Sequence, residues 1–316
     1  MIAVSSWRCH CSRQRIRSLR SLLLVAPWWI SSVAAMSTHV TERDGSGTIF
    51  VSPRNEGAQS ALMVICHGLG DSAEGFADVA EQLASQMPHI KFILPTAPTQ
   101  PVTMNMGMPM PSWYDIKGLD ERANEDCKGI SESRARIEKI LADEHSSTGL
   151  PYSRMILAGF SQGGALSLFT GLQLDQAIAG IVVLSGYLPA ASKFHPKQFQ
   201  VPVWHGHGTM DPMVQLSMAE KTKKRLLDAG IQKYTLQTFP IPHSVSPEEL
   251  RKMMQFVAQV LPPDDSCKIQ LKDPKDMSVK ELKAAIKKAG LGSKAVGLME
   301  KSEFVKLVED HRAGKL

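Results

Sequence analysis

The sequence predicts an α/β fold with a mostly parallel central sheet and helices on both faces. Two observations lead to this prediction. Short runs rich in β-branched and other apolar residues alternate with longer amphipathic stretches through the middle of the chain, which is typical of successive β-α-β units. The connections between parallel strands are right-handed, so such units build a doubly wound sandwich. Residues 42–264 are therefore expected to form one domain.

Each element of this domain is expected from its own residues. The first clear strand is a run of six apolar residues, and a polar, amphipathic stretch follows it. The expected strands are 61–66, 90–94, 154–158, 178–184, 201–205 and 234–239. The expected helices are 72–87, 129–146, 162–174, 216–228 and 247–260. Residues 95–118 are rich in Pro, Met and Gly, so we expect a long loop there.

Residues 1–36 differ from the rest of the chain and do not resemble folded structure. They hold five Arg, no Lys and no acidic residue, a composition typical of an organelle transit peptide. The apolar run 22–30, followed by 32–35, also resembles a secretory leader, and a start of translation at Met36 would remove the segment altogether. Without a functional leader the expected location is the cytoplasm; with one, it is a mitochondrion, a plastid or the secretory route.

The formal charge of +5 and the five cysteines exclude some classes of function. Residues 42–267 carry a formal charge of −5 and residues 268–316 carry +5, so the body gives no reason to bind nucleic acid. The cysteines are odd in number and contain no CxxC pair, which argues against a disulfide framework and a zinc site. Cys66 lies in an apolar run, where a buried structural thiol is expected. We expect no metal and no cofactor.

The strongest motif is a GxSxG around Ser161. It reads Gly159-Phe160-Ser161-Gln162-Gly163 and stands between an expected strand and an expected helix. In the α/β-hydrolase fold this context holds a nucleophilic serine on a strained turn, where small residues two positions before and after let strand and helix pass closely. We therefore expect Ser161 to be a catalytic nucleophile.

The base and its acid are expected from chain order and from loop position. α/β-Hydrolases place their triad in the order Ser, acid, His. Asp211 follows the strand 201–205, and His243 stands between prolines after the last strand; active-site loops of open α/β sheets lie at these carboxyl ends. His205 and His207 precede the acid and break the order. Glu249 begins a helix and is expected to match its dipole.

An oxyanion hole is expected at the loop His67-Gly68-Leu69-Gly70-Asp71, which follows the first strong strand. The backbone N–H of Leu69 is the candidate first donor, and that of Gln162, after the nucleophile, the second. His67 is expected to hold the shape of the loop. A simple helix N-terminal turn capped by Asp71 is compatible with the same residues.

These segments together resemble the acyl-protein thioesterase/lysophospholipase family, which includes small carboxylesterases. The resemblance rests on HGLGD, PSWYDI (111–116), GFSQGGALSL (159–168), HGTMDPMV (207–214) and His243 before Ser244, and it spans about residues 60–262. It implies a serine hydrolase that cleaves long-chain acyl thioesters of S-acylated (palmitoylated) proteins or acyl esters of lysophospholipids, with transient contact to a membrane surface. It supports Ser161, Asp211 and His243, and it places Trp113 near the acyl channel. A general short-chain carboxylesterase is the alternative.

Met104, Met106, Met108 and Met110 alternate along the loop before Trp113. Flexible, polarizable methionine suits an adaptable surface for a long acyl chain, so the first three are candidate channel residues. A loop packed by methionine under Trp113 explains the pattern equally well.

Residues 265–316 extend beyond the resemblance and are expected to form a linker and a two-helix module. Residues 278–291 and 298–308 resemble the small SAP-like domain, which binds nucleic acid in some proteins and protein in others. Lys280, Lys283, Lys287 and Lys288 share one helix face. A solvated face is favoured over nucleic-acid binding. A scaffold that acts through this tail is the alternative from another class of function.

Overall fold

The computed structural model describes residues 38–119, 125–269, 271–313 and 315–316, with only the backbone of Lys288. The expected leader, 1–36, lies outside the described residues. Among the described residues, no helix is both long enough and apolar enough to cross a membrane.

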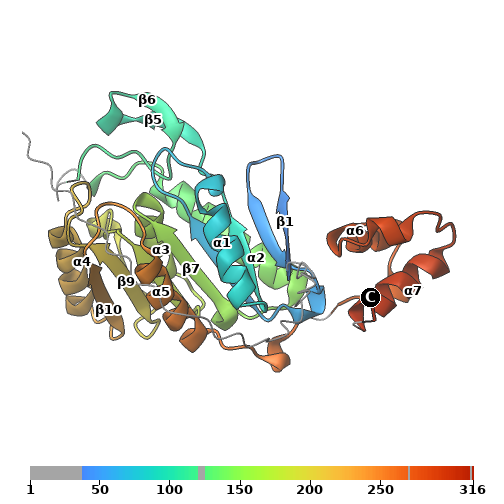
Figure 1. Cartoon of the computed structure of the whole chain (residues 1–316). Helices are drawn as coiled ribbons and strands as arrows, with labels where there is room; N and C mark the ends of the chain where they lie inside the picture. The colour runs from blue at the N-terminus through green and yellow to red at the C-terminus, as the bar shows by residue number, and fades with distance from the viewer. Residues whose placement is uncertain (1–37, 120–124, 270, 314) are drawn as a thin grey trace, which may run out of the picture. The chain divides into compact units, whose positions relative to one another are not determined.

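One eight-stranded sheet forms the centre of the structure, in the order β1-β2-β4-β3-β7-β8-β9-β10 (Figure 1). The six strands from β4 to β10 in this order run parallel, and β1 and β2 join antiparallel at one edge. The bounds are β1 His39–Arg43, β2 Ile49–Pro53, β3 Ala61–Cys66, β4 Ile90–Leu94, β7 Met155–Phe160, β8 Gly180–Leu184, β9 Val203–Gly208 and β10 Tyr234–Phe239. The predicted mostly parallel sheet is confirmed.

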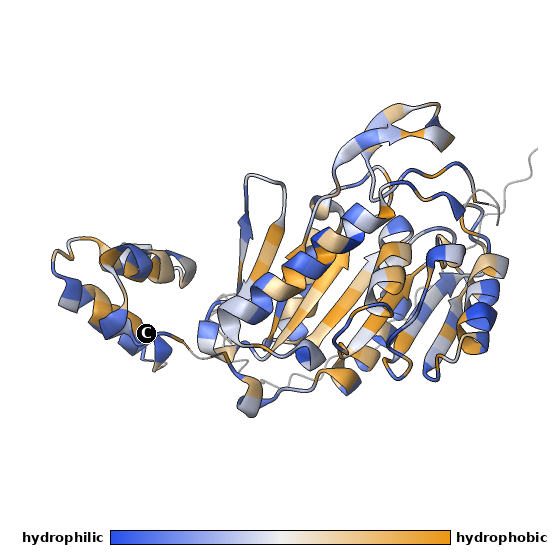
Figure 2. Cartoon of the chain, turned by 180° about the vertical axis from the view of Figure 1, so that it is seen from behind, coloured by the Kyte–Doolittle hydropathy of each residue, from blue (hydrophilic) through white to orange (hydrophobic). Residues whose placement is uncertain are grey.

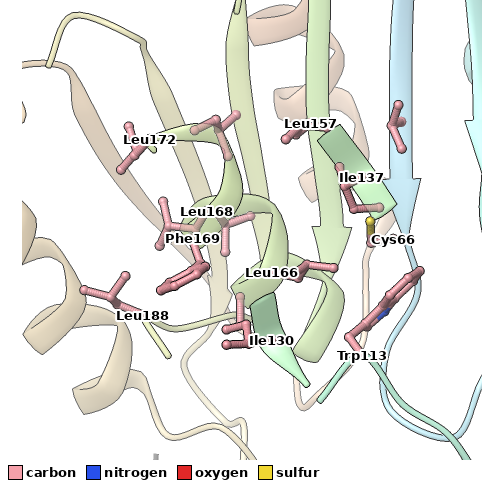
Figure 3. Packing of buried hydrophobic residues seen from close by; sticks show 14 of the residues in the cluster. Cys66, Trp113, Ile130, Ile137, Leu157, Leu166, Leu168, Phe169, Leu172 and Leu188 are labelled. Atoms are coloured by element: carbon pink, nitrogen blue, oxygen red, sulfur yellow. The ribbon is translucent and has the colours of Figure 1, made fainter. Parts of the chain in front are cut away.

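Helices cover both faces of this sheet because its strands are apolar on both sides. Along β3, Leu62, Val64 and Cys66 face one core with α2, α3 and α4, while the alternate residues face a second core with α1 and α5. Figure 3 shows the first core, where side chains of α2 and α3 pack on β3 and β7. The bounds are α1 Ala77–Gln86, α2 Ile130–Thr148, α3 Gln162–Gly171, α4 Leu216–Asp228 and α5 Pro247–Val260.

Two hairpins depart from the sequence prediction. β1 and β2 were not expected. Residues 95–118, expected as a loop, contain the separate antiparallel pair β5 (Thr99–Val102) and β6 (Met108–Pro111), which lies apart from the large sheet (Figure 1). The turn between them holds Met106 at φ 56° and Gly107 at φ 74°. Period-2 alternation could not reveal this hairpin, because prolines and methionines form much of it.

Two C-terminal helices, α6 (Val279–Lys288) and α7 (Lys301–Arg312), have a hydrophobic cluster of their own. The predicted capping box of α6 is present: Glu281 N donates to Ser278 Oγ at 3.2 Å, and Ser278 N donates to Glu281 Oε2 at 2.6 Å. Figure 2 shows how hydropathy divides, with apolar residues along the strands of the central sheet and polar residues along the outer sides of helices. The cluster between α6 and α7 gives these two helices a small core of their own.

Candidate active site

Ser161 occupies a strained turn between β7 and α3. Its backbone has φ 53° and ψ −118°, an unusual conformation for a residue with a side chain. The serine N–H donates to Leu184 O of β8 at 2.8 Å, which holds the turn against the sheet. A Cβ added at Gly159 would lie 2.3 Å from Gly163 C, and one at Gly163 would lie 2.2 Å from Cys66 O. Only glycine fits these two positions, so the spacing of the motif has a steric cause.

The structure brings Ser161, His243 and Asp211 into one hydrogen-bonded chain. His243 Nε2 lies 3.0 Å from Ser161 Oγ, and His243 Nδ1 lies 2.6 Å from Asp211 Oδ2. The aspartate side chain is fully buried, whereas the histidine side chain is 18% exposed. Since a carboxylate only accepts, Nδ1 carries the proton and Nε2 is left to accept from the serine hydroxyl. This arrangement can activate a serine for attack on a carbonyl carbon.

The loop that carries Asp211 is fixed by backbone bonds. Asp211 Oδ1 accepts from the N–H groups of Met213 and Val214, each at 2.9 Å. Met210 N donates to Ile241 O at 3.1 Å, which joins the acid loop to the loop that holds the histidine. The carboxylate is therefore stabilised by two backbone donors, and its loop is bonded to the loop that carries His243.

A row of buried side chains lies behind this acid. His207 Nε2 contacts Val214 O at 2.8 Å, His205 Nε2 lies 3.2 Å from His207 Nδ1, and His205 Nδ1 bonds the hydroxyl of Tyr234. A carbonyl only accepts, so in neutral rings His207 donates to Val214, His205 donates to His207, and Tyr234 donates to His205. Burial lowers the pKa of both histidines, that of His205 strongly, which keeps them neutral. His207 also lies 3.9 Å from Asp211 Oδ2.

The expected oxyanion loop is held by its own histidine. Ala97 N donates to His67 Nε2 at 2.9 Å, so the opposite nitrogen carries the hydrogen and donates to Gly68 O at 2.6 Å. Gly70 N donates to Pro111 O of β6 at 2.8 Å, which links the loop to the β5–β6 hairpin. Leu69, whose N–H is the expected first donor, is half-buried against the main core. The shape-holding function expected of His67 fits these contacts.

The side chain of Gln162 performs a task that the sequence did not reveal. It is buried, and its Oε1 accepts from Trp113 N at 2.9 Å while its Nε2 donates to Tyr114 O at 2.8 Å. Trp113 Nε1 in turn donates to His67 O at 2.8 Å. The residue after the nucleophile thus ties the segment 112–114 to α3, and that segment ties down the oxyanion loop.

The four candidate residues for an acyl channel lie in different surroundings. Trp113 is fully buried, with its ring 5.1 Å from that of His67. Met104 packs against the main core, whereas Met106 is 90% and Met108 is 52% exposed. Trp113 and Met104 are packed in or against the core and Met106 and Met108 face solvent, so the acyl channel stays a prediction.

Two other residues near the site were missed or misjudged. The Phe160 ring lies 4.7 Å from the His243 ring and so covers one side of the base. Glu249 was expected to match the dipole of α5 and does lie in its first turn, but it is fully buried, and neither carboxyl oxygen has a hydrogen-bond partner among the described residues. A Cβ added at Gly206 of β9 would lie 2.3 Å from its Oε1. Burial raises its pKa to about 7, a desolvation that no sequence pattern signals.

Comparison with known proteins finds relatives that all point to one family. Residues 48–261 match the family model described as phospholipase/carboxylesterase. The chain is 38% identical over 233 residues to acyl-protein thioesterase 1 of Mycosarcoma maydis, covering 68% of this chain and 97% of that protein. It is 40% identical over 207 residues to acyl-protein thioesterase 1 homolog 1 of Dictyostelium discoideum, covering 64% of this chain and 92% of the relative.

Solved structures agree with these relatives. Arabidopsis thaliana SOBER1 matches with a TM-score of 0.57 and 28% identity, over 64% of this chain and 99% of the other. Zea mays acyl-protein thioesterase 2 matches with a TM-score of 0.59 and 26% identity, over 68% of this chain and 98% of the other. The similarity covers nearly the whole of each neighbour.

Proposed function

The chain belongs to the phospholipase/carboxylesterase family, and from this premise we propose that Ser161, His243 and Asp211 hydrolyse long-chain acyl thioesters of S-acylated proteins. The enzyme is a serine hydrolase of acyl thioesters or esters. The observation that carries the assignment of residues is the pair of contacts at His243, 3.0 Å to Ser161 Oγ and 2.6 Å to Asp211 Oδ2. The names of the relatives favour the thioester over the ester.

The reaction follows from which atoms can donate. Ser161 Oγ attacks the acyl carbonyl carbon while His243 Nε2 takes the hydroxyl proton. The C–S bond then breaks, and the cysteine sulfur leaves with that proton from the imidazolium. Water attacks the acyl-enzyme with the same base, which releases the fatty acid and restores the serine. Asp211 accepts from His243 Nδ1 throughout, so it fixes the tautomer and stabilises the charged ring.

The developing oxyanion would be bound by backbone donors. The proposed donors are the N–H groups of Leu69, in the loop held by His67, and of Gln162, the first residue of α3. The positive end of the helix dipole adds to the second donor. Both donors are fixed before substrate arrives, so stabilising the transition state requires little reorganisation.

The test compares hydrolysis of a palmitoyl-cysteine peptide, lysophosphatidylcholine and an acetyl ester by the wild type and by Ser161→Ala. We expect cleavage of the thioester to have the highest kcat/KM and to disappear with the serine. Cleavage of the acetyl ester alone would replace this proposal with a short-chain carboxylesterase. Activity that survives Ser161→Ala would refute the nucleophile.

A further inference from the structure

An apolar groove with a basic rim lies on the two-helix tail. It has a volume of about 250 Å³, and its base is formed by Ile286 of α6 and Phe304 of α7. Val296, from the connection between the helices, stands at its side with 81% of its surface exposed. Met299, three residues further on, is 86% exposed. Two large apolar side chains therefore face solvent within four residues of chain.

The charged residues that line this groove are lysines. Lys283 and Lys287 line it, and the Lys283 ammonium lies 5.2 Å above the ring of Phe304. None of the described lining residues is acidic. The nearest acids by sequence are engaged elsewhere: Glu281 forms the capping box of α6 and pairs with Lys272, and Glu300 and Glu303 form a capping box with the backbone of α7. The groove thus combines exposed apolar groups with positive charge.

We propose that this face of the tail binds the surface of an anionic phospholipid membrane. Val296 and Met299 would enter the boundary between headgroups and acyl chains, and the lysines would remain at the level of the lipid phosphates with their aliphatic stems on the apolar surface. The charge division of the chain supports this occupant, because the tail carries +5 and the body −5. An anionic surface attracts the tail and repels the body.

A membrane fits the groove better than nucleic acid does. Lysines suit both ligands, since both present phosphates. Exposed valine and methionine gain no stabilisation from a phosphodiester backbone. When they enter lipid, their apolar surface leaves water, which is favourable. The proposal goes beyond the proposed reaction, because it assigns where the enzyme binds and leaves its chemistry unchanged.

The experiment measures co-sedimentation of the full chain carrying Ser161→Ala with vesicles of phosphatidylcholine, with and without phosphatidylserine. We expect binding that requires phosphatidylserine and weakens as salt is raised. The double variant Lys283→Gln/Lys287→Gln should weaken binding about tenfold or more, since each lysine near an anionic surface contributes severalfold. Val296→Ser/Met299→Ser should weaken it with no change of charge.

A matched control removes two positive charges from the body. Lys139→Gln/Lys224→Gln changes two side chains that are 72% and 78% exposed, and it should leave vesicle binding unchanged. In the active background, hydrolysis of a water-soluble ester should be equal for all these variants, which shows that they fold. Because binding is measured without turnover, failure of the proposed reaction would not affect it.

Three results would overturn the proposal. One is an absence of vesicle binding, or vesicle binding that is equally strong without phosphatidylserine. Another is binding that the groove variants leave at the wild-type level. The third is duplex DNA bound more tightly than the vesicles and lost with the same lysines, which would assign the face to nucleic acid.

Discussion

The two sides of Ser161 are held in different ways. On the side of the acid, beyond β9 and β10, titratable side chains form a buried row from Tyr234 through His205 and His207 to the acid loop. On the oxyanion side, beyond β3, the side chain of Gln162 bonds backbone groups, and Trp113 bonds another. The first arrangement depends on protonation, and the second does not.

This difference has a physical cause. In the proposed reaction the acid side holds a carboxylate and a histidine that changes charge in each cycle, so neutral neighbours of fixed tautomer are an advantage. In the same proposal the oxyanion side holds two N–H groups in place, and bonds between amides and backbone do this at every pH. Substitutions on the two sides should therefore differ in how their effects depend on pH.

The largest effect is expected from Asp211→Asn. The amide keeps the size of the side chain but can donate to His243 Nδ1, which would favour the wrong tautomer. We expect kcat to fall by about 10⁴-fold at neutral pH. Steady-state kinetics on a thioester measure this, and a thermal melt should show a folded protein. A loss of less than tenfold would show that Asp211 is not the partner of the base.

His207→Leu should disturb the support of the Asp211 loop, one residue behind the acid itself. It removes the donor to Val214 O and leaves the adjacent acid loop less firmly placed. Displacement of a catalytic group can cost up to about 10²-fold, so we expect a decrease of that order or smaller, mostly in kcat. His207→Gln can donate to the same carbonyl and should recover most of the activity. Equal losses in both variants would show that the hydrogen bond is not what matters.

Gln162→Ala tests the oxyanion side. The backbone N–H remains, but Trp113 N and Tyr114 O lose their buried partner, which should cost about 1–3 kcal/mol of unfolding free energy. We expect kcat to fall about tenfold, less than the about 10²–10³-fold that follows removal of an oxyanion donor, and equally across pH.

Gln173→Ala is the matched control. Gln173 is also buried, and its side chain bonds Phe169 O at 2.7 Å and His195 N at 2.9 Å, away from the site. It should lose similar stability while its kcat stays unchanged. A pH-dependent loss in Gln162→Ala would contradict the contrast between the two sides.

Glu249→Gln should have the smallest effect on activity and should change the pH dependence of stability instead. The native pKa of about 7 lies above the ordinary 4.5, so the folded state holds a proton that the unfolded state loses. Stability from this group is present below pH 4.5 and is lost as pH rises to 7 and beyond, by about 3 kcal/mol. The variant should be as stable as the wild type at pH 5 and more stable at pH 8 in urea unfolding. Equal stability at pH 8 would contradict the buried charge.

The sequence predicted the parts of the site that follow from steric rules and chain order. Ser161 was predicted as the nucleophile because its turn requires glycine at both flanking positions, and Asp211 and His243 were predicted as its partners because parallel strands end at one edge. The structure brings the three side chains together. The order rule also set aside His205 and His207 as triad members, and both lie behind the acid. The strands 61–66, 90–94 and 234–239 have the predicted bounds.

The rest depends on contacts between segments far apart in the sequence. Gln162 and Trp113 meet across 49 residues, and no local pattern signals that a glutamine side chain will bond a distant backbone. Glu249 carries the signature of an exposed helix start, and only the packing of α5 on β9 buries it. The β5–β6 hairpin was missed because prolines and methionines conceal its strands.

Two buried cysteines, Cys66 and Cys127, bear on whether the proposed acyl group could pass to the protein's own sulfur. Cys66 lies beneath the nucleophile turn and Cys127 in the same core, and burial raises the pKa of their thiols to about 12 and about 11. At neutral pH about one thiol in 10⁴ or fewer is a thiolate, the form that attacks thioesters. If the proposed acyl group forms on Ser161, we therefore expect these two core sulfurs to stay unacylated and the acyl group to pass to water.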